Sequence, residues 1–168
     1  RPERTLMDLL REQLEDRRQR PRDDFVTMLI GTELPPLGLL SFLVGAVIAG
    51  HETTLIAATN LAYQLGLEPA LQTRLRAEPA LVGRAVDESL RHRSPVQNFV
   101  RTLTEDVQHH GATMRAGDKV MLLFGAANRD PARYADPERF DLDRYDSDRD
   151  AGRNLAYGHG VHRCVGAH

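Results

Sequence analysis

The amino-acid sequence predicts a mainly α-helical protein with a small antiparallel β component. Apolar residues recur at helical spacing through most of the first 93 positions, which indicates a series of helices. Between residues 96 and 124 the pattern changes to short alternating and apolar runs bounded by glycine turns, which indicates short strands. With 168 residues, of which 41% are hydrophobic and 27% charged, the chain is long enough for a single domain with a real core.

Composition and charge exclude several functional classes. The formal net charge is −2 with the seven histidines counted as neutral, which gives no support to nucleic-acid binding. A single cysteine excludes an internal disulfide and suits a reducing cytoplasm. Leu34 to Gly50 is uncharged but shorter than the roughly 18 apolar residues of a membrane span, so no membrane association is expected. No signal peptide follows Arg1, and the missing initiator methionine and abrupt end at His168 suggest a fragment.

The first two helices are predicted from apolar spacing and capping residues. Leucines on one face of an amphipathic helix are Leu6, Leu9, Leu10 and Leu14. Residues 16–24 form a charged connector, and its arginines are interpreted as a solvated turn. A second short helix over residues 25–30 begins after a cap at Asp23 or Asp24, and Gly31 ends it.

A long helix over about residues 36–67 is predicted to cross the domain. Its first half is apolar nearly all round, so we expect it to be buried. Gly50, Glu52 and Thr53 interrupt this apolar surface, and a buried glutamate needs a partner. An exposed helix edge is the alternative interpretation of this polar group. A zinc-protease motif is excluded, because position 55 is leucine where that motif needs a second histidine.

The second half of the chain is predicted to contain shorter elements. Helices are expected over about residues 70–77 and 81–93, short strands over 96–124, and an irregular meander over 134–153. Glu88 and Arg91 lie three residues apart on one helix face, where they can pair. On a solvent-exposed helix such a pair contributes only about 0.2–0.5 kcal/mol, so spacing alone gives it little weight.

The last twelve residues, 157–168, surround the only cysteine of the chain. Cys164 is structural filler, a nucleophile or a metal ligand. The glycines at positions 158, 160 and 166 let a ligand approach the main chain closely, which a cysteine bound to a flat cofactor would need. A thiolate ligand also requires positive charge nearby, which Arg163 and His162 could supply. Zinc is the alternative, with candidate ligands His159, His162, Cys164 and His168, although their spacing fits no common zinc motif.

The pattern aromatic-Gly-x-Gly-x-His-x-Cys-x-Gly over residues 157–166 resembles the haem-binding loop of the cytochrome P-450 family, the haem-thiolate monooxygenases. The resemblance implies that Cys164 is the proximal iron ligand and that His162 contacts a haem propionate. It also implies that Tyr157, Gly158 and Gly166 contact the cofactor, haem b with an axial thiolate. Tyr157 stands where the family usually has phenylalanine.

Other segments resemble the same family in the family's order. Ala49 and Gly50 match the positions where the oxygen-binding helix passes close over the haem. Glu52 and Thr53 match the acid-alcohol pair that delivers protons to dioxygen, a task that needs a hydroxyl group supplied by a titratable group. Arg101 matches an arginine that binds a haem propionate, because a guanidinium fork suits a carboxylate.

The family also has a structural network that the sequence resembles. Glu88 and Arg91 match its E-x-x-R motif, which forms a buried network with a later arginine. The segment Y-A-D-P-E-R-F-D-L-D-R over residues 134–144 resembles the one that carries this third partner, predicted here as Arg139. Substrate contacts implied by the resemblance are Val44, Ala46 to Ile48, Val96, Gln97, Asn98 and Phe99.

The matches run from about Leu37 onward and imply the C-terminal part of the cytochrome P-450 fold, of the soluble bacterial type. The implied reaction inserts one atom of dioxygen into a small hydrophobic organic substrate in the cytoplasm. Electrons would come from a separate ferredoxin- or flavodoxin-type donor, which Arg153 and Arg163 could help to dock. Because the family's domain is longer, we expect this fragment alone to fold poorly or bind haem weakly. The alternatives are a non-enzymatic His/Cys metal-binding or interaction module and an inactive truncated family member.

Overall fold

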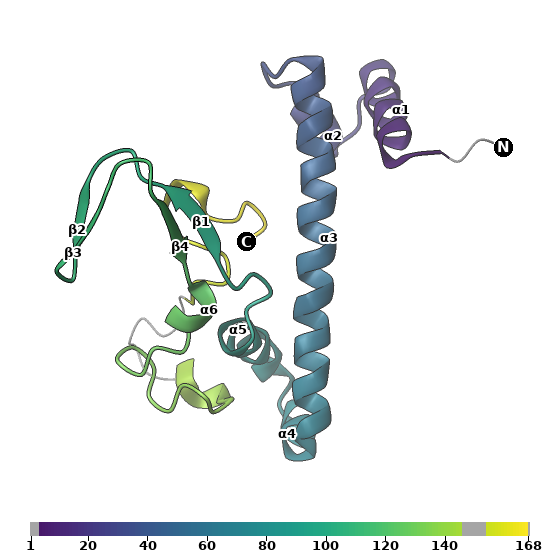
Figure 1. Cartoon of the computed structure of the whole chain (residues 1–168). Coiled ribbons are helices and arrows are strands. Elements are labelled where there is room, and N and C mark those ends of the chain that lie inside the picture. Colours follow the sequence, from purple (N-terminus) through teal and green to yellow (C-terminus); the bar gives the residue numbers. More distant parts are fainter. Residues whose placement is uncertain (1–3, 146–153, 168) are drawn as a thin grey trace. The chain divides into compact units, whose positions relative to one another are not determined.

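A computed structural model describes residues 4–145 and 154–167 of the chain. It confirms the predicted fold class, because helices dominate and two small antiparallel sheets accompany them (Figure 1). The chain divides into two compact units, Arg1–Glu52 and Thr53–His168, each with its own packing. That the whole chain forms one domain stays a prediction.

The first unit begins with two capped helices. α1 spans Leu6–Gln19, and Thr5 forms a reciprocal capping box with Asp8, which satisfies backbone donors that the first turn leaves free. α2 spans Phe25–Ile30, and its N-cap is Asp24, whose side chain accepts a hydrogen bond of 2.9 Å from the Thr27 amide. The structure therefore selects Asp24 from the two candidate caps.

Leucine side chains form the core of the first unit. Buried core residues are Leu14, Leu29, Leu39, Leu40 and Leu43, with Met7, Leu10, Val26 and Ile30 partly buried against them. Each fully buried leucine contributes about 1.5–3 kcal/mol relative to an exposed one, so these contacts hold the three helices of this unit together.

The long helix α3 spans Pro36–Leu67, and most of its surface is exposed. The expectation that its first half is buried is therefore wrong for the described residues. In the first unit, Leu39, Leu40 and Leu43 are the buried residues of α3, and the centre of the Phe42 ring lies 6.0 Å from that of Phe25. Only 17% of the most apolar stretch of α3 is buried. Length and composition alone would allow α3 to cross a membrane, which is weak evidence because core helices of soluble proteins meet the same criteria.

The second unit contains the end of α3 and the remaining short helices. α4 spans Pro69–Ala77, the 3₁₀ turn η1 spans Pro79–Leu81, and α5 spans Val82–His92. Pro69 and Pro79 both stand in a first turn, where the missing N–H costs nothing. Its buried apolar residues are Leu71, Leu81, Ala85 and Leu142, with Leu61, Leu65, Leu75 and Phe140 packed against them.

Two small antiparallel sheets complete the second unit (Figure 1). β1 (Phe99–Thr102) pairs with β4 (Lys119–Leu122), and β2 (Val107–His109) pairs with β3 (Ala112–Met114). The β2–β3 hairpin turns at His110 and Gly111, whose φ angles are both positive, as a tight two-residue turn requires. The shorter elements are α6 (Phe124–Ala127), η2 (Leu142–Tyr145) and η3 (Gly160–His162).

Candidate functional site

The loop around Cys164 is held in shape by its own backbone. Gly158 and Gly160 have φ angles of 69° and 77°, a left-handed conformation that glycine adopts without strain. The Cys164 amide donates a hydrogen bond of 2.8 Å to the Tyr157 carbonyl, and the Gly158 amide donates one of 2.9 Å to the Leu155 carbonyl. These bonds close the loop and fix the position of the cysteine backbone.

The outer surface of this loop is exposed and carries apolar side chains beside the cysteine. Cys164 is exposed, as is His162. Val161 is 97% exposed and Val165 is 78% exposed, and the ring of Tyr157 is also at the surface. A thiol flanked by apolar side chains on an open surface is suited to a large, flat, apolar group that covers them.

The donor set at this loop fits haem better than zinc. Structural zinc takes four protein ligands, whereas haem iron needs one or two because the macrocycle supplies the other donors. Among the residues that the structure describes, no three His, Cys, Asp or Glu side chains cluster as a metal site would require. His159, His162 and Cys164 therefore form no three-ligand site with one another or with other described residues, and His168 lies outside the described residues.

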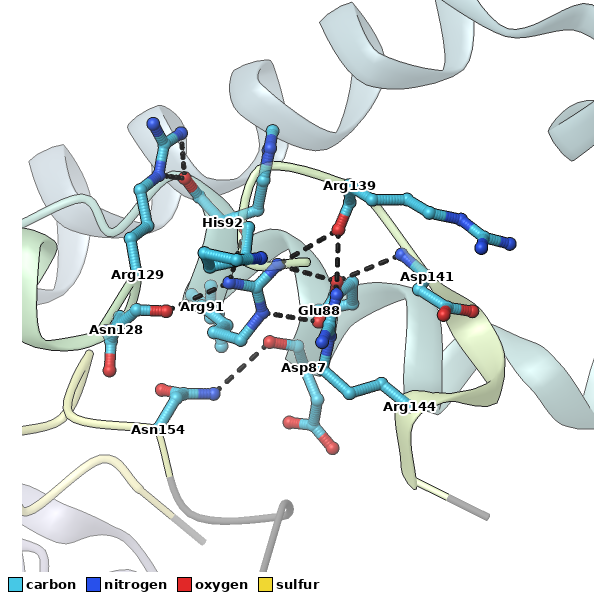
Figure 2. A network of polar contacts seen from close by, with 12 residues as sticks. Asp87, Glu88, Arg91, His92, Asn128, Arg129, Arg139, Asp141, Arg144 and Asn154 are labelled. Atoms are coloured by element: carbon cyan, nitrogen blue, oxygen red, sulfur yellow. Dashed lines mark hydrogen bonds and ion pairs between the residues drawn. The ribbon is translucent and has the colours of Figure 1, made fainter. Parts of the chain in front are cut away.

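A buried ion pair lies on α5, in the same unit as the loop (Figure 2). Glu88 and Arg91 are both 0% exposed. Nε and Nη2 of Arg91 donate two hydrogen bonds of 2.8 Å to the two carboxylate oxygens of Glu88. The other donors of Arg91 reach the carbonyls of Asn128, Pro137 and Arg139 at 2.9, 2.9 and 3.2 Å. Removing one partner from such a pair would leave an uncompensated buried charge.

The third partner of this network is Arg144, so the prediction of Arg139 is wrong. Nε of Arg144 donates to Oε1 of Glu88 at 3.1 Å, and its other nitrogens reach the carbonyls of Ala135, Asp136 and Arg139. Arg139 has an exposed side chain and contributes only its backbone carbonyl to these contacts. The physical reason is the η2 turn, which returns Arg144 to α5, while Asp141 donates its amide to Glu88 at 2.9 Å.

Sequence reasoning missed the buried asparagine that joins this network to the loop. Asn128 is 0% exposed and follows α6 directly. Its Oδ1 accepts a hydrogen bond of 2.7 Å from the Leu155 amide, and its Nδ2 donates one of 2.8 Å to Ser94. Asn154 adds a bond of 3.2 Å to the Asp87 carbonyl. In the sequence, residues 126–131 resemble a segment of the family and indicate a short helix and turn, which gives Asn128 itself no specific role.

His92 and Arg129 brace the same helix end. Burial lowers the pKa of His92 below its ordinary value, which favours the neutral ring. Nε2 of His92 lies 2.9 Å from the Glu138 carbonyl, so this nitrogen carries the proton and donates. Arg129 donates from Nε and Nη2 to the His92 carbonyl at 3.0 and 2.5 Å. These contacts fasten the end of α5 to Arg129 and to Glu138 in the meander.

The remaining predicted site residues lie on two other elements. Arg101 is exposed on β1, opposite Val120, and its guanidinium lies 5.8 Å from the ring centre of Phe99. Ala49, Gly50 and Glu52 are exposed on α3 in the first unit, and Thr53, half-buried, begins the second. Of these five residues, only Thr53 and Arg101 share a unit with Cys164. That all five approach one cofactor stays a prediction.

One predicted substrate contact lines an open cavity of the second unit. Gln97 borders a space of about 490 Å³ whose charged or titratable lining residues are His92, Arg93 and Arg129. These side chains make the cavity polar, so it does not by itself suit an apolar substrate. The predicted contacts with large apolar side chains, Val47, Ile48 and Phe99, are exposed.

Comparisons with known proteins match nearly the whole chain. The sequence model of the family described as Cytochrome P450 matches residues 2–168. The biotin biosynthesis cytochrome P450 of Bacillus subtilis is 38% identical over 165 residues, which cover 96% of this chain and 40% of that protein. The steroid C26-monooxygenase of Mycobacterium tuberculosis is 35% identical over 171 residues, covering 95% of this chain and 43% of that one.

A solved structure has the same fold. The crystal structure of P450BioI, in complex with an acyl carrier protein ligated to hexadec-9Z-enoic acid, matches with a TM-score of 0.86 and 37% identity. The match covers 96% of this chain and 42% of the other. The chain thus spans about two fifths of the length of these relatives.

Proposed function

This chain belongs to the cytochrome P450 family, and from that premise we propose that the complete protein containing it is a haem-dependent monooxygenase with Cys164 as the iron ligand. The observation that carries the proposal is the closed loop that presents one exposed thiol after two left-handed glycines, Gly158 and Gly160. Family membership implies haem with thiolate ligation, and Cys164 is the one cysteine in this chain. A bound haem with a thiolate ligand supplies dioxygen activation, because the sulfur donates electron density that favours O–O cleavage.

The loop residues would orient and cover the cofactor. Tyr157, Val161 and Val165 offer apolar surface beside the thiol. The exposed His162 is a candidate partner for a propionate, and so is Arg101, whose planar guanidinium suits a carboxylate. Gly158 and Gly166 leave room for close approach, and no part of the described chain lies within 3.4 Å of a Cβ added at either position.

Glu52 and Thr53 are the residues that we assign to proton delivery. They are adjacent on α3, where Glu52 is open to solvent and Thr53 is half-buried. A solvent-exposed carboxyl group can collect a proton, and a neighbouring hydroxyl group can pass it inward because it both accepts and donates. Ala49 and Gly50, one turn earlier, would form the close approach of the helix to the cofactor.

We assign a small hydrophobic organic compound as the substrate. The candidate contacts on α3, Val47 and Ile48, and Phe99 on β1 are large, apolar and exposed. Two relatives support an apolar substrate class: one is named for a steroid, and the structure of another holds a fatty acyl chain on its carrier protein. Because the acyl chain in that structure is attached to a carrier protein, the substrate of this protein could be either a free apolar compound or an acyl chain bound to a carrier protein.

The electron donor in this proposal is a separate ferredoxin- or flavodoxin-type protein. Such donors carry acidic surfaces, which basic residues around the cysteine loop would attract. Arg163 is exposed next to Cys164 and can serve in this way. Arg153, the other predicted docking residue, lies outside the described residues. We place the complete protein in the cytoplasm and assign it neither nucleic acid nor membrane as a partner.

Isotope-labelled dioxygen tests the proposal. The complete haem-loaded protein is supplied with NADH, a surrogate ferredoxin and its reductase, and either hexadecanoic acid or testosterone in ¹⁸O₂. We expect a hydroxylated product that carries one ¹⁸O atom, and no product from Cys164→Ser. A product whose new oxygen comes from water would contradict monooxygenation. Unchanged turnover in Cys164→Ser would show that another group binds the iron.

A further inference from the structure

We propose that Asn128 is a positioning residue that holds Cys164 in place from behind the loop. The inference rests on the proposed function, since it assigns the cysteine a ligand that depends on its position. Asn128 is fully buried and lies 36 positions before Cys164 in the sequence. It touches no substrate or cofactor in this proposal, and it acts through the backbone of residues 155–164.

An unbroken series of hydrogen bonds leads from Asn128 to the cysteine. Oδ1 of Asn128 accepts from the Leu155 amide at 2.7 Å. The Leu155 carbonyl accepts from the Gly158 amide at 2.9 Å, and the carbonyl of Tyr157, the residue before, accepts from the Cys164 amide at 2.8 Å. Each bond fixes the backbone that makes the next one, so the side chain of Asn128 sets where the loop begins.

The chemistry of its partners fixes the orientation of this amide. The Leu155 N–H can only donate, so the group that faces it must be the oxygen Oδ1 of Asn128. The nitrogen Nδ2 then faces the hydroxyl of Ser94 at 2.8 Å. Ser94 gives its own proton to the Leu90 carbonyl at 2.9 Å and is therefore free to accept. No other rotamer of the amide would satisfy both neighbours.

Asn128 also connects the loop to the buried charge network. Its backbone carbonyl accepts from Nη1 of Arg91 at 2.9 Å, and Arg91 is held by Glu88 (Figure 2). The hydrogen-bond network thus extends from the ion pair of Glu88 and Arg91, through Asn128, to the Leu155 amide. A second, weaker attachment is Asn154, whose Nδ2 donates to the Asp87 carbonyl at 3.2 Å.

The loop needs such an attachment because its outer side has little to pack against. Val161, Cys164 and Val165 are all exposed, so apolar burial within the described chain cannot fix their position. Losing the Oδ1 acceptor would leave a part-buried N–H without a partner and release the start of the loop. A thiol that moves relative to the iron would exchange thiolate ligation for a neutral thiol or another ligand.

The test uses the complete protein with three substitutions. Asn128→Ala removes both side-chain bonds. Asn128→Asp keeps an acceptor for Leu155 and is the conservative rescue. Ser94→Ala is the matched control, because it removes the partner of Nδ2 and leaves the bond to Leu155 intact. The readouts are amide hydrogen exchange over residues 155–164 in the haem-free protein, and the fraction of the red-shifted Soret band after haem loading, reduction and carbon monoxide.

In Asn128→Ala we expect amide exchange over residues 155–164 to be about fivefold to tenfold faster, as the loss of one buried hydrogen bond implies. The red-shifted fraction should fall at least twofold. Ser94→Ala should lower the thermal midpoint but leave both loop readouts at the wild-type level, and Asn128→Asp should restore most of the red-shifted fraction. Equal loop readouts in Asn128→Ala and wild type would overturn the proposal, and so would an equal loss of the red-shifted band in Ser94→Ala.

If Asn128→Ala does not fold, Asn128→Ser carries the test, because its shorter polar side chain fills part of the space but no longer reaches the Leu155 amide. It should accelerate exchange over residues 155–164, and unchanged exchange there would overturn the positioning role. The proposed function fails separately: wild-type protein with no red-shifted band would refute thiolate ligation. A wild-type band that Asn128→Ala leaves intact would refute only the role of Asn128.

Discussion

Charged side chains pair with one another in both units of the chain, but they are fully buried in only one of them. In residues 53–168, Glu88 and Arg91 have no exposed side-chain surface, and Arg144 is 8% exposed. In residues 1–52, Asp24 pairs with Arg17 while 30% of its side chain is exposed. Both clusters use arginine and a carboxylate, so they differ in burial and not in chemistry.

This difference decides what each cluster can do. A buried pair must be complete, since removing one charge leaves the other without water or partner, at a cost of about 3–5 kcal/mol. A pair that water reaches is screened and adds little to stability, but its carboxyl group can still titrate. The buried cluster therefore fixes the place of the meander and the loop, whereas the surface cluster makes stability depend on pH.

Glu88→Gln should produce the largest effect. It keeps the size of the side chain but leaves Arg91 and Arg144 buried without their carboxylate. We expect the free energy of unfolding to fall by about 3–5 kcal/mol, measured by urea denaturation of the complete protein. Glu78→Gln is the matched control, because Glu78 is exposed and lies 3.7 Å from its partner Arg74. Equal losses in both variants would show that burial does not make the Glu88 carboxylate more important for stability than an exposed one.

Comparing Arg144→Ala with Arg139→Ala tests which of the two arginines is the third partner in the network of Glu88 and Arg91. Arg144 donates to Glu88 and to backbone carbonyls, so its loss should cost about 1.5–3 kcal/mol, the range for hydrogen bonds to charged groups. Arg139 has an exposed side chain, and its substitution should change unfolding by less than about 0.5 kcal/mol. Chemical denaturation of both variants measures the contrast. The reverse order would restore Arg139 as the partner.

Glycine substitutions in the cysteine loop should have an intermediate, local effect. Gly160 has a φ of 77°, so Gly160→Ala forces a left-handed alanine that costs about 1–2 kcal/mol. That cost corresponds to about fivefold to thirtyfold faster exchange of the Cys164 amide in haem-free protein. Gly166→Ala is the control, since an added Cβ would only reach ordinary contact with the Cys164 sulfur at 3.8 Å. Similar exchange in both variants would show that the left-handed turn is dispensable.

Asp24→Asn should have the smallest effect, a loss of stability that is present above about pH 4 and disappears in acid. Hydrogen bonds from Arg17 and then from the Thr27 amide lower the pKa of Asp24 from 3.8 to about 2. Because the folded pKa lies below the unfolded one, this stabilisation is present above about pH 4 and is lost as pH falls toward 2. Asp24→Asn keeps the cap on α2 and should flatten this acid limb in denaturation curves, whereas Asp23→Asn should not.

Sequence patterns predicted the helices and strands better than the burial and the long-range contacts of these elements. Apolar spacing and proline positions indicated α3 and the helix with Glu88, because these signals are local. The burial of α3 could not be predicted that way, since burial depends on which segments cover the helix. Arg139 and Arg144 are both arginines in one polar segment, and only the η2 turn determines which one reaches Glu88.

The residues of the candidate site also differ in whether the sequence alone could predict them. Cys164 and its glycines were recognisable because their types and spacing are unusual together. Asn128 was not, because an asparagine after a short helix is common and its importance comes from contacts with Ser94 and Leu155 that are distant in sequence. Long-range hydrogen bonds of this kind become visible only when the fold is known.

The absorption spectrum of the complete, haem-loaded protein, reduced and treated with carbon monoxide, tests the central claim most directly. Wild-type protein and Cys164→Ser are compared at equal haem content. We expect a red-shifted Soret band in the wild type that disappears in Cys164→Ser, because the thiolate of Cys164 is the proposed iron ligand. An unshifted band in the wild type, or a red-shifted band that persists in Cys164→Ser, would contradict it.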